Sequence, residues 1–295
     1  MAKLINSKNL SWLKHLPKLR ESLVLRMNSS SNDLVETSKI DKTFLIGINR
    51  PEHRNAVNPE TAHQLFKAFQ QFEADDDCYV AVLHGKGGNF CAGFDLKALS
   101  QFEENLQFPG FEDSKEGPMG PSRMMLSKPV IGAISGYAVA GGLELALLCD
   151  LRVVEETTIM GVFCRRFGVP LIDGGTVRLP QLIGLSRALD LILTGRPIGG
   201  KEALSFGLAN DCVSTGTALG VACLMAKRIS DFPQTCLCTD RKSAYYSTFD
   251  SKSLDDALNY EYSNGIKVVN QESIKGAVEF TDGKGRHGQF KTSKL

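Results

Sequence analysis

Short apolar segments alternate along this chain with longer segments of helical periodicity, and this alternation constrains the fold more than any other feature. Strands are predicted at residues 43–48, 79–84, 130–134 and 151–154. The second of these is apolar throughout, as in a parallel sheet that is buried on both faces. Helices are predicted at residues 58–72, 141–149, 186–194 and 201–206. The alternation of strands with helices predicts an α/β architecture.

Local signals mark where several predicted helices begin and end. Asn58 is a good helix cap, and Pro59 suits the first helical position. Gly207 stands just after the helix at 201–206, where glycine commonly ends a helix. Residues 225–290 also look helical, so we expect an α-rich segment there.

Composition excludes several classes of protein. With 295 residues, the chain is long enough for one large domain or two small ones. Its 42% hydrophobic and 23% charged residues are ordinary globular values, which exclude a disordered chain, a collagen and a coiled coil. A net charge of +1 argues against a dedicated nucleic-acid binder. No apolar stretch approaches the ~20 residues that span a bilayer, so we expect no membrane span.

The eight cysteines are scattered along a chain in which we find no secretory signal. This pattern favours small buried thiols over a disulfide framework. Cys236 and Cys238 are the only close pair, and their spacing does not suit a zinc site. We therefore expect reduced cysteines and no bound metal.

The two ends of the sequence carry different targeting signals. Residues 1–32 are basic and contain serine, with Glu21 as their only acid and leucines at helical spacing. This composition suits either a mitochondrial transit peptide or an ordinary amphipathic extension. Ser293-Lys294-Leu295 matches the peroxisomal import signal. We favour the C-terminal signal because it is a full match, and we predict a peroxisomal protein, with the mitochondrial matrix as the alternative.

Four glycine-bearing or turn-rich segments are the candidates for chemistry. They are residues 50–56, 90–95, 136–144 and 168–176. Three of them follow predicted strands, and ligands of α/β sheets bind beyond the carboxyl ends of strands. No phosphate-binding glycine motif is present, which disfavours ATP and dinucleotides. The long loop at 101–127 is interpreted as a mobile wall over a binding site or as a disordered surface insertion.

Glu144 is the first candidate catalytic residue. Small residues around Gly141 let a ligand approach backbone N–H groups, and two such groups that converge on one carbonyl oxygen form an oxyanion hole. The helix that begins near Gly141 adds the positive end of its dipole. A carboxyl group enclosed by Ala, Val, Leu and Gly should have a raised pKa, which suits acid–base catalysis. The alternative is a carboxylate that only stabilises the first turn of this helix.

Taken in chain order, these segments resemble the enoyl-CoA hydratase/isomerase (crotonase) family. The resemblance covers about residues 40–290. Its motifs are Asn49-Arg50-Pro51, Arg54-Asn55-Ala56, Phe90-Cys91-Ala92-Gly93-Phe94-Asp95-Leu96-Lys97, Lys128-Pro129-Val130-Ile131, Gly136-Tyr137-Ala138, Ala140-Gly141-Gly142-Leu143-Glu144-Leu145-Ala146, Cys149-Asp150, Gly174-Gly175-Thr176, Arg178-Leu179-Pro180, Ile183-Gly184, Thr194-Gly195, Ala203-Leu204 and Gly207-Leu208. The resemblance implies an α/β fold with a crotonase-like spiral of repeated ββα units and a helical C-terminal trimerisation region. It also implies a homotrimer or a dimer of trimers.

The resemblance further implies an enzyme that acts on an acyl-CoA thioester. The N–H groups of Phe94 and Gly141 match the positions that bind the thioester oxygen and stabilise the enolate that forms on it. The positions that match the lining of the CoA site are Arg54, Ala56, Ala92, Asp95 and Leu96. No metal and no redox cofactor is implied, since the CoA thioester is the substrate.

The sequence departs from the hydratase pattern at one position. A hydratase of this family uses two glutamates; Glu144 matches the first, and Cys164 stands where the second falls. A thiol beside two arginines is a poor acid, because the cations favour thiolate. Asp173 is the nearby alternative acid, in a Gly-rich turn that contributes acidic residues in some other members of the family. Its alternative role is only to form that turn.

Three hypotheses follow for the function. The first is an enoyl-CoA hydratase with Glu144 as base and Asp173 as second acid. The second is an enoyl-CoA isomerase, which needs only one carboxylate and which Cys164 favours. The third is a non-catalytic CoA-binding scaffold, which the presence of Glu144 disfavours. The predicted domains are a basic extension or transit peptide at 1–32, an acyl-CoA domain at 33–290 with its helical part at 225–290, and a tail at 291–295.

Overall fold

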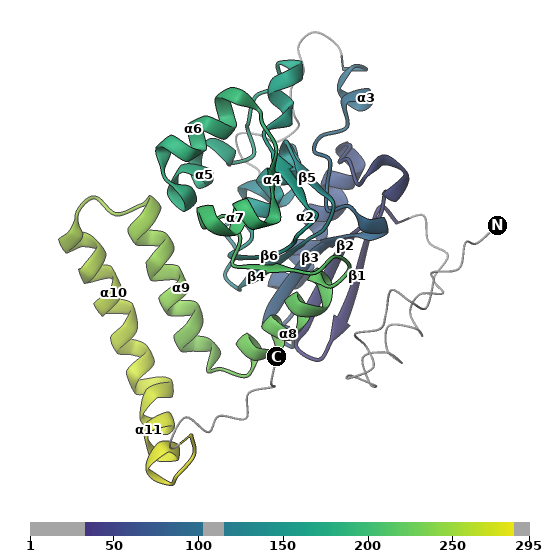
Figure 1. The fold of residues 1–295 in the computed structure, drawn as a ribbon. Coiled ribbons are helices and arrows are strands. Elements are labelled where there is room, and N and C mark those ends of the chain that lie inside the picture. The colour runs from purple at the N-terminus through teal and green to yellow at the C-terminus, as the bar shows by residue number, and fades with distance from the viewer. Residues whose placement is uncertain (1–32, 103–114, 286–295) are drawn as a thin grey trace.

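The computed structural model describes residues 33–102 and 115–285 of the chain (Figure 1). The targeting signals predicted at residues 1–32 and at Ser293-Lys294-Leu295 lie outside the described residues. Strands of a largely parallel sheet alternate with helices along the chain, which confirms the predicted α/β architecture.

A six-stranded sheet forms the centre of the fold, in the order β1-β2-β3-β4-β6-β9. Its strands are β1 (Val35–Ile40), β2 (Thr43–Ile48), β3 (Val80–Gly85), β4 (Val130–Ile134), β6 (Leu151–Glu155) and β9 (Asp211–Val213). β1 runs antiparallel to β2, and all other neighbours are parallel. The four predicted strands are confirmed as β2, β3, β4 and β6. β1 is an edge strand in which only Val35 is buried and the other residues are half-buried or exposed in alternation, so it lacks the continuous apolar run that marks the others.

A second sheet has three short strands in the order β5-β7-β8. They are β5 (Tyr137–Val139), β7 (Ile159–Gly161) and β8 (Ile198–Gly199). Strands of two or three residues carry no periodicity signal, and none of these was predicted. They complete a repeated order of elements, because β1 and β2 lead to a helix and β4 and β5 lead to another. This is the predicted succession of ββα units.

Helices surround the sheets. The helices of the described residues are α2 (Pro59–Glu73), α3 (Leu96–Leu99), α4 (Gly141–Leu148), α5 (Gly175–Ile183), α6 (Leu185–Thr194), α7 (Gly200–Phe206), α8 (Ala218–Ser230), α9 (Gln234–Phe249), α10 (Leu254–Val268) and α11 (Ile274–Thr281). The four helices predicted in the body are confirmed as α2, α4, α6 and α7. The predicted cap of α2 is also confirmed, because Asn58 Oδ1 accepts the Thr61 N–H at 2.9 Å.

Both faces of the six-stranded sheet are covered by helices (Figure 1). On one face α8 packs against β3, β4 and β6, with Ala222 in the apolar cluster between them. On the other face α2 and α4 bury Phe69 and Leu145. Successive strand residues point to opposite faces, so β3 contributes Val82 to the first cluster and Leu83 to the second. Burying a side chain such as Leu83 stabilises the fold by roughly 1.5–3 kcal/mol.

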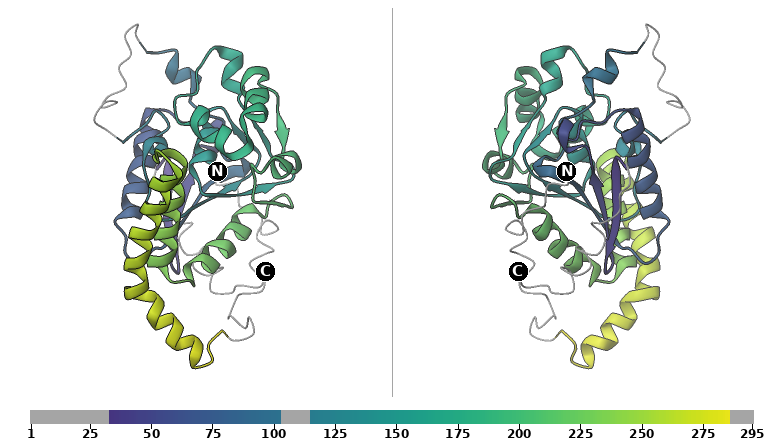
Figure 2. Two further views of the ribbon diagram at one scale, coloured as in Figure 1. Left: turned by 90° about the vertical axis from the view of Figure 1, so that its left-hand side faces the viewer. Right: turned by 90° about the vertical axis from the view of Figure 1, so that its right-hand side faces the viewer.

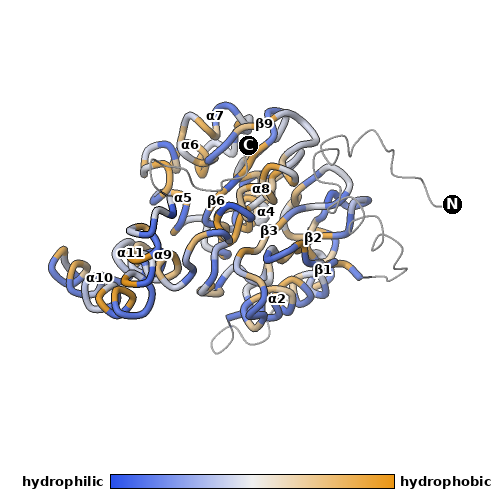
Figure 3. Tube along the Cα trace, turned by 90° about the horizontal axis from the view of Figure 1, so that it is seen from below, coloured by the Kyte–Doolittle hydropathy of each residue, from blue (hydrophilic) through white to orange (hydrophobic). Residues whose placement is uncertain are grey.

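The C-terminal helices form an arm along one side of the body (Figures 1 and 2). α9 and α10 pack against each other, and the rings of Tyr246 and Tyr260 stack between them at 3.8 Å. Asp150 ties α9 to the body, because its Oδ1 accepts from Arg241 Nε at 2.8 Å and from the Tyr245 hydroxyl at 2.9 Å. Seen from below, hydrophobic and hydrophilic residues alternate along α10 (Figure 3).

Candidate active site

The glycine-bearing segments predicted to carry chemistry lie side by side, with the segment that begins at Cys91 in the middle. On one side of it, the Ala92 N–H donates to the Arg54 carbonyl at 3.0 Å. On the other side, the Cys91 N–H donates to the Tyr137 carbonyl at 2.8 Å. Three segments that are far apart in the sequence therefore meet beyond the ends of β2, β3 and β4.

Phe94, a predicted oxyanion donor, lies in this middle segment and pairs with Val57 in a parallel bridge. Val57 donates to the Gly93 carbonyl, and the Asp95 N–H donates to the Val57 carbonyl, both at 2.8 Å. In such a bridge the N–H of the intervening residue points to the opposite side, so the Phe94 N–H faces away from Val57. Cys91 Sγ accepts the Gly93 N–H at 3.3 Å, which holds the turn before Phe94.

Gly141, the other predicted oxyanion donor, is the first residue of α4, so its N–H has no acceptor inside the helix. Ala140 precedes it with φ 54° and ψ −126°, a conformation that costs an L residue roughly 1–3 kcal/mol. The Ala140 N–H donates to the Gly161 carbonyl at 2.9 Å, which holds this turn. Gly93 approaches closely, because a Cβ on it would lie 3.1 Å from Gly141 N. The structure thus brings the segments of both predicted donors together.

Glu144 lies in the first turn of α4, and only 2% of it is exposed. Its Oε1 accepts the Asp173 N–H at 2.9 Å and the Gly175 N–H at 2.8 Å. Gly175 allows this approach, because a Cβ on it would lie 2.9 Å from Oε1. No donor among the described residues reaches Oε2. One oxygen is therefore held in place, and the other is available for proton transfer.

The environment of Glu144 brings its pKa near neutrality. Burial is the main cause, and the charge of Asp173 adds to it. The N–H groups of Gly175 and Asp173 and the cation of Arg178 act in the opposite direction. Together they raise the pKa of Glu144 to about 7. A carboxyl group with this pKa can accept and return a proton at neutral pH.

Asp173 is also buried. Its N–H bonds to Glu144, whereas its carboxylate bonds to other groups. Its Oδ1 accepts the Met119 N–H at 2.9 Å and the hydroxyl of Ser122. Burial raises the pKa of Asp173 although these two donors act to lower it. No donor in the described part of the chain reaches Oδ2. Asp173 therefore joins the returning end of the 101–127 loop to the start of α5.

The described end of that loop differs from the prediction of a mobile wall or a disordered insertion. Residues 117–122 are buried. Gly117 and Gly120 exchange backbone hydrogen bonds at 2.7 and 2.8 Å, which closes a tight turn. The side chain of Met119, in this turn, packs on Gly141, where a Cβ would lie 2.7 Å from Met119 Sδ. The sequence predicted a wall at this place but not that its described end is packed, since composition alone does not distinguish a packed loop from a mobile one.

Cys164, the residue at the second hydratase position, lies in a short 3₁₀-helix at Phe163–Phe167 and is buried. Burial raises the pKa of the Cys164 thiol, and the charge of Glu144 raises it further. Of the two neighbouring arginines expected to favour thiolate, Arg165 acts in that direction, but burial and Glu144 outweigh it. Arg165 lowers the pKa only partly, and the Arg166 guanidinium lies 3.8 Å from the centre of the Phe163 ring. Cys164 is therefore a neutral thiol near Glu144.

The residues predicted to line the CoA site gather on two hydrogen-bonded segments, 54–57 and 91–96. Arg54 is exposed, and its guanidinium lies 5.1 Å from the centre of the Tyr137 ring. Leu96 is 41% exposed, whereas Ala56 and Ala92 are half-buried.

Asp95 differs from the other predicted CoA-site residues, because it is committed to a protein partner. It forms an ion pair with Arg50 at 3.0 Å, and Arg50 also donates to the Ala56 carbonyl. Burial acts to raise the pKa of the Asp95 carboxyl, but the hydrogen bonds from Arg50 and the Lys97 N–H outweigh it and lower the pKa. This role of Arg50 was not predicted, since its partner stands 45 residues away.

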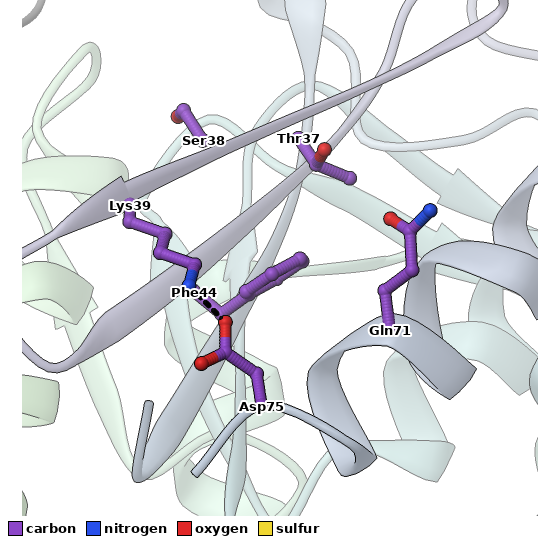
Figure 4. A pocket seen from close by; sticks show the side chains of 6 residues that line it. All are labelled: Thr37, Ser38, Lys39, Phe44, Gln71 and Asp75. Atoms are coloured by element: carbon purple, nitrogen blue, oxygen red, sulfur yellow. Dashed lines mark ion pairs between the residues drawn. The ribbon is translucent and has the colours of Figure 1, made fainter. Parts of the chain in front are cut away.

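A separate cavity lies between β1, β2 and the end of α2 (Figure 4). Its volume is about 470 Å³, and it is lined by Thr37, Ser38, Lys39, Phe44, Gln71 and Asp75. Lys39 and Asp75 form an ion pair there, and the hydrogen bond from Lys39 lowers the pKa of Asp75. No predicted site residue lines this cavity. The lowered pKa of Asp75 favours its ionised form. It does not compete with the Glu144 site as a place for proton transfer.

Three further observations bear on the class of protein. Within residues 33–102 and 115–285, no three His, Cys, Asp or Glu side chains are grouped so that they could hold a metal ion. No helix in the same ranges is long and apolar enough to cross a membrane. All eight cysteines are free thiols.

The fold and the site define an α/β protein that pairs two closely approaching backbone segments with a buried carboxyl group near neutral pKa. Comparison with known proteins agrees with this class. Residues 41–290 match the family model described as enoyl-CoA hydratase/isomerase. The chain therefore belongs to the enoyl-CoA hydratase/isomerase family of enzymes, and the predicted crotonase fold is confirmed.

Individual relatives span most of the chain. This chain is 37% identical to enoyl-CoA hydratase EchA19 of Mycobacterium tuberculosis, over 64% of this chain and 71% of that protein. It is 30% identical to probable enoyl-CoA hydratase 2, mitochondrial, of Arabidopsis thaliana, over 95% of this chain and 96% of that protein. A crystal structure of an enoyl-CoA hydratase from Mycobacterium tuberculosis H37Rv superposes with a TM-score of 0.77 at 33% identity, covering 84% of this chain and 96% of that one.

Proposed function

We propose that this protein is an enoyl-CoA hydratase that uses Glu144 as its base. The observation that carries the proposal is the state of Glu144: buried, near neutral pKa, fixed through Oε1 and without a protein donor on Oε2. Because Glu144 lies one turn beyond Gly141, its carboxyl group stands at the end of the helix where the thioester oxygen would bind. The names of the relatives support the same reaction.

The proposed reaction adds water across the double bond of a 2-enoyl-CoA. Glu144 Oε2 takes a proton from water while the water oxygen bonds to Cβ of the substrate. The electron pair of the double bond moves onto the thioester oxygen, which accepts hydrogen bonds from the N–H groups of Phe94 and Gly141. Loss of one such donor typically costs about 3–4 kcal/mol of transition-state stabilisation. A second acid then protonates Cα, and the protons redistribute before the next turnover.

Asp173 is the proposed second acid. Burial raises its pKa, which is the direction that a proton donor requires, and Oδ2 has no partner among the described residues. Its Oδ1 is held by Ser122 and Met119, so the group has a fixed orientation. The same contacts also suit an anchor for the loop, and Asp173 variants separate the two roles.

A second candidate function is an enoyl-CoA isomerase, and Cys164 favours it. Moving a double bond requires one group that takes a proton from one carbon and returns it to another, which Glu144 alone can do. A neutral thiol at the position of the second hydratase glutamate leaves Glu144 as the main acid–base group. A non-catalytic CoA-binding scaffold is the third candidate, and it gives no reason for a carboxyl group with a pKa near 7.

The proposed CoA-binding residues are Arg54, Ala56, Ala92, Asp95 and Leu96. Arg54 is exposed and offers its cation to an anionic CoA, which the small net charge of the chain does not attract from a distance. Because Asp95 already pairs with Arg50, its proposed contribution is to shape this segment. The substrate brings its own CoA, and no metal or redox cofactor is proposed.

A homotrimer or a dimer of trimers is the proposed assembly. The arm supports it, because α10, α11 and the π-helical turn at Val269–Ser273 between them expose a continuous set of large apolar side chains. These are Leu254, Leu258, Tyr262, Ile266, Val269, Ile274, Val278 and Phe280. Exposed apolar surface of this extent is typical of a protein interface. We assign the domain at 33–290 to the subunit body and its arm.

Peroxisomal import through Ser293-Lys294-Leu295 is the proposed localisation, with the mitochondrial matrix as the alternative. The mitochondrial name of the Arabidopsis thaliana relative supports the alternative. Fusion of a fluorescent protein to either end, which masks one signal at a time, tests both. Fluorescence in peroxisomes only when the C-terminus is left free of the fusion supports peroxisomal import.

The reaction is tested by incubating the enzyme with 2-enoyl-, 3-enoyl- and branched acyl-CoAs and separating the products by chromatography and mass. A gain of one water from a 2-enoyl-CoA supports the hydratase. A product of unchanged mass but different retention supports the isomerase. Binding of these CoA esters without any turnover would support the scaffold and overturn the proposal.

A further inference from the structure

We infer that Arg178 is a positioning residue that holds the 173–175 turn against Glu144 and links it to the loop at Ser122. Arg178 lies in the first turns of α5, in the segment Arg178-Leu179-Pro180. Because the inference concerns the proposed base, it rests on the proposed function. The contacts that carry it do not depend on which reaction the enzyme performs.

The Arg178 guanidinium bonds two backbone carbonyls from separate segments. Its NH1 donates to the Asp173 carbonyl at 3.1 Å, and its NH2 donates to the Ser122 carbonyl at 2.8 Å. In the part of the chain that the structure describes, no carboxylate oxygen lies within ion-pair distance of it. Arg178 therefore forms no direct ion pair with these residues, and its positive charge acts on nearby titratable groups over longer distances.

Two consecutive glycines connect Arg178 with Glu144. A Cβ on Gly174 would lie 2.2 Å from the Arg178 NH1, and a Cβ on Gly175 would lie 2.9 Å from Glu144 Oε1. Gly174 also has φ +96°, a backbone conformation that L side chains rarely adopt. The turn is thus enclosed by the guanidinium on one side and the carboxylate on the other. Its two N–H groups that reach Glu144 come from Asp173 and Gly175.

Several charged or titratable groups face Glu144 or its neighbours, and Arg178 is the cation that acts on both carboxyl groups. Asp173 faces Glu144 from the turn, and Cys164 faces it from the 3₁₀-helix. Arg123 acts on Asp173 from the loop side. The titratable groups near Arg178 itself are Tyr245, Glu144, Asp173 and Cys149. Arg178 lowers the pKa of Glu144 and of Asp173, against the effect of burial.

Loss of Arg178 therefore has a defined electrostatic consequence. Removing a nearby cation disfavours the carboxylate, and a looser turn gives weaker N–H donation to Oε1; both raise the pKa of Glu144. A proposed base must be ionised to accept a proton, so its activity would then begin at higher pH. A residue that only packs α5 against the body would leave the midpoint of this titration unchanged.

The experiment compares the wild-type enzyme with Arg178→Met and Arg178→Lys. Side-chain carboxyl carbons of glutamate are labelled with ¹³C, and the Glu144 resonance is assigned with Glu144→Gln and followed by NMR through a pH titration. We expect the midpoint to rise by about one pH unit in Arg178→Met, as for loss of an opposite charge, and by less in Arg178→Lys. In an active enzyme the acid limb of kcat/KM should move with it. Arg187→Met, on the exposed side of α6, is the matched control and should leave both unchanged.

Each outcome decides one point. An unchanged Glu144 midpoint in folded Arg178→Met would overturn the inference, even if activity fell. Failure of both Arg178 variants to fold would assign the residue to folding and would also overturn it. If the wild type turns over none of the acyl-CoAs, the proposed function fails, but a shifted midpoint still supports the positioning of Glu144.

Discussion

The backbone N–H of Asp173 donates to Glu144 Oε1 at 2.9 Å, while the Asp173 carboxylate turns away to Ser122 and Met119. Two buried carboxyl groups are thereby neighbours without sharing a hydrogen bond between their side chains. Burial already disfavours ionisation of Glu144, and the charge of Asp173 is the second cause of its raised pKa. The relationship fixes the orientation of the Glu144 carboxyl group and, together with burial, raises its pKa to about 7.

Glu144→Gln should keep acyl-CoA binding and lower turnover by at least ~100-fold, because removal of a general acid or base typically costs this much. The amide keeps the size of the side chain and an acceptor for the N–H groups of Asp173 and Gly175. Steady-state kinetics with crotonyl-CoA and calorimetric binding of a CoA ester measure the two effects. Turnover within a few-fold of wild type would exclude Glu144 as the base.

The same variant should change how stability depends on pH. The folded protein raises the pKa of Glu144 from 4.5 to about 7, so the folded state binds this proton more tightly than the unfolded state. Wild-type stability should therefore fall relative to Glu144→Gln as pH rises from 4.5 to about 7. The difference should reach about 3 kcal/mol and then level off, since one pKa unit corresponds to ~1.4 kcal/mol.

Urea unfolding of both proteins at several pH values measures this difference. Curves that stay parallel over the whole range would show that Glu144 titrates normally, and the explanation of its proton transfer would fail with them.

Asp173→Asn should lower hydration of crotonyl-CoA by about 100-fold if Asp173 is the second acid. Ser122→Ala is the matched control, because it keeps the carboxyl group and removes one of its hydrogen bonds, worth about 0.5–1.5 kcal/mol. Its turnover should stay within a few-fold of wild type. Unchanged hydration in Asp173→Asn would leave this residue as the anchor of the loop and favour the isomerase.

Charge on the apolar face of the arm should weaken the proposed assembly. Leu258→Glu and Tyr262→Glu, combined, place two carboxylates on a surface where the present side chains are 52% and 71% exposed in the single chain. Desolvating these charges at an interface is costly, so we expect smaller species in analytical ultracentrifugation. Lys267→Glu, on the exposed side of the same helix, is the control. A variant that sediments like wild type would place the interface elsewhere.

Much of the fold followed from local signals. β2 and β4 were predicted with their observed ends. A continuous apolar run bounded by turn residues indicates a strand from a few neighbouring residues alone. Asn58 likewise marks the start of α2 through a contact with Thr61, three residues on. The strands β5, β7 and β8 escaped prediction, because two or three residues become a strand only when a distant partner pairs with them.

Only part of the candidate site could be predicted from the sequence. Glu144 was found from its place in the first turn after Gly141, and Asp173 from its glycine-rich turn. The net pKa shift of Cys164 could not be predicted from the arginines beside it in the sequence, because burial and the charge of Glu144 have larger effects on its thiol. Arg178 carried no sign of its role, since its second carbonyl partner lies 56 residues away.

By itself, the sequence determined the local elements, the family and the place of Glu144 at the head of α4, because caps, apolar runs and glycine turns act over a few residues. Only the tertiary structure decided how Glu144 is protonated, what Asp173 holds and where Arg178 acts. Those properties depend on burial and on charges that the fold brings together from α4, α5 and the loop at Ser122. The packing of these elements sets the distances between those groups, and these distances cannot be read from spacings along the sequence.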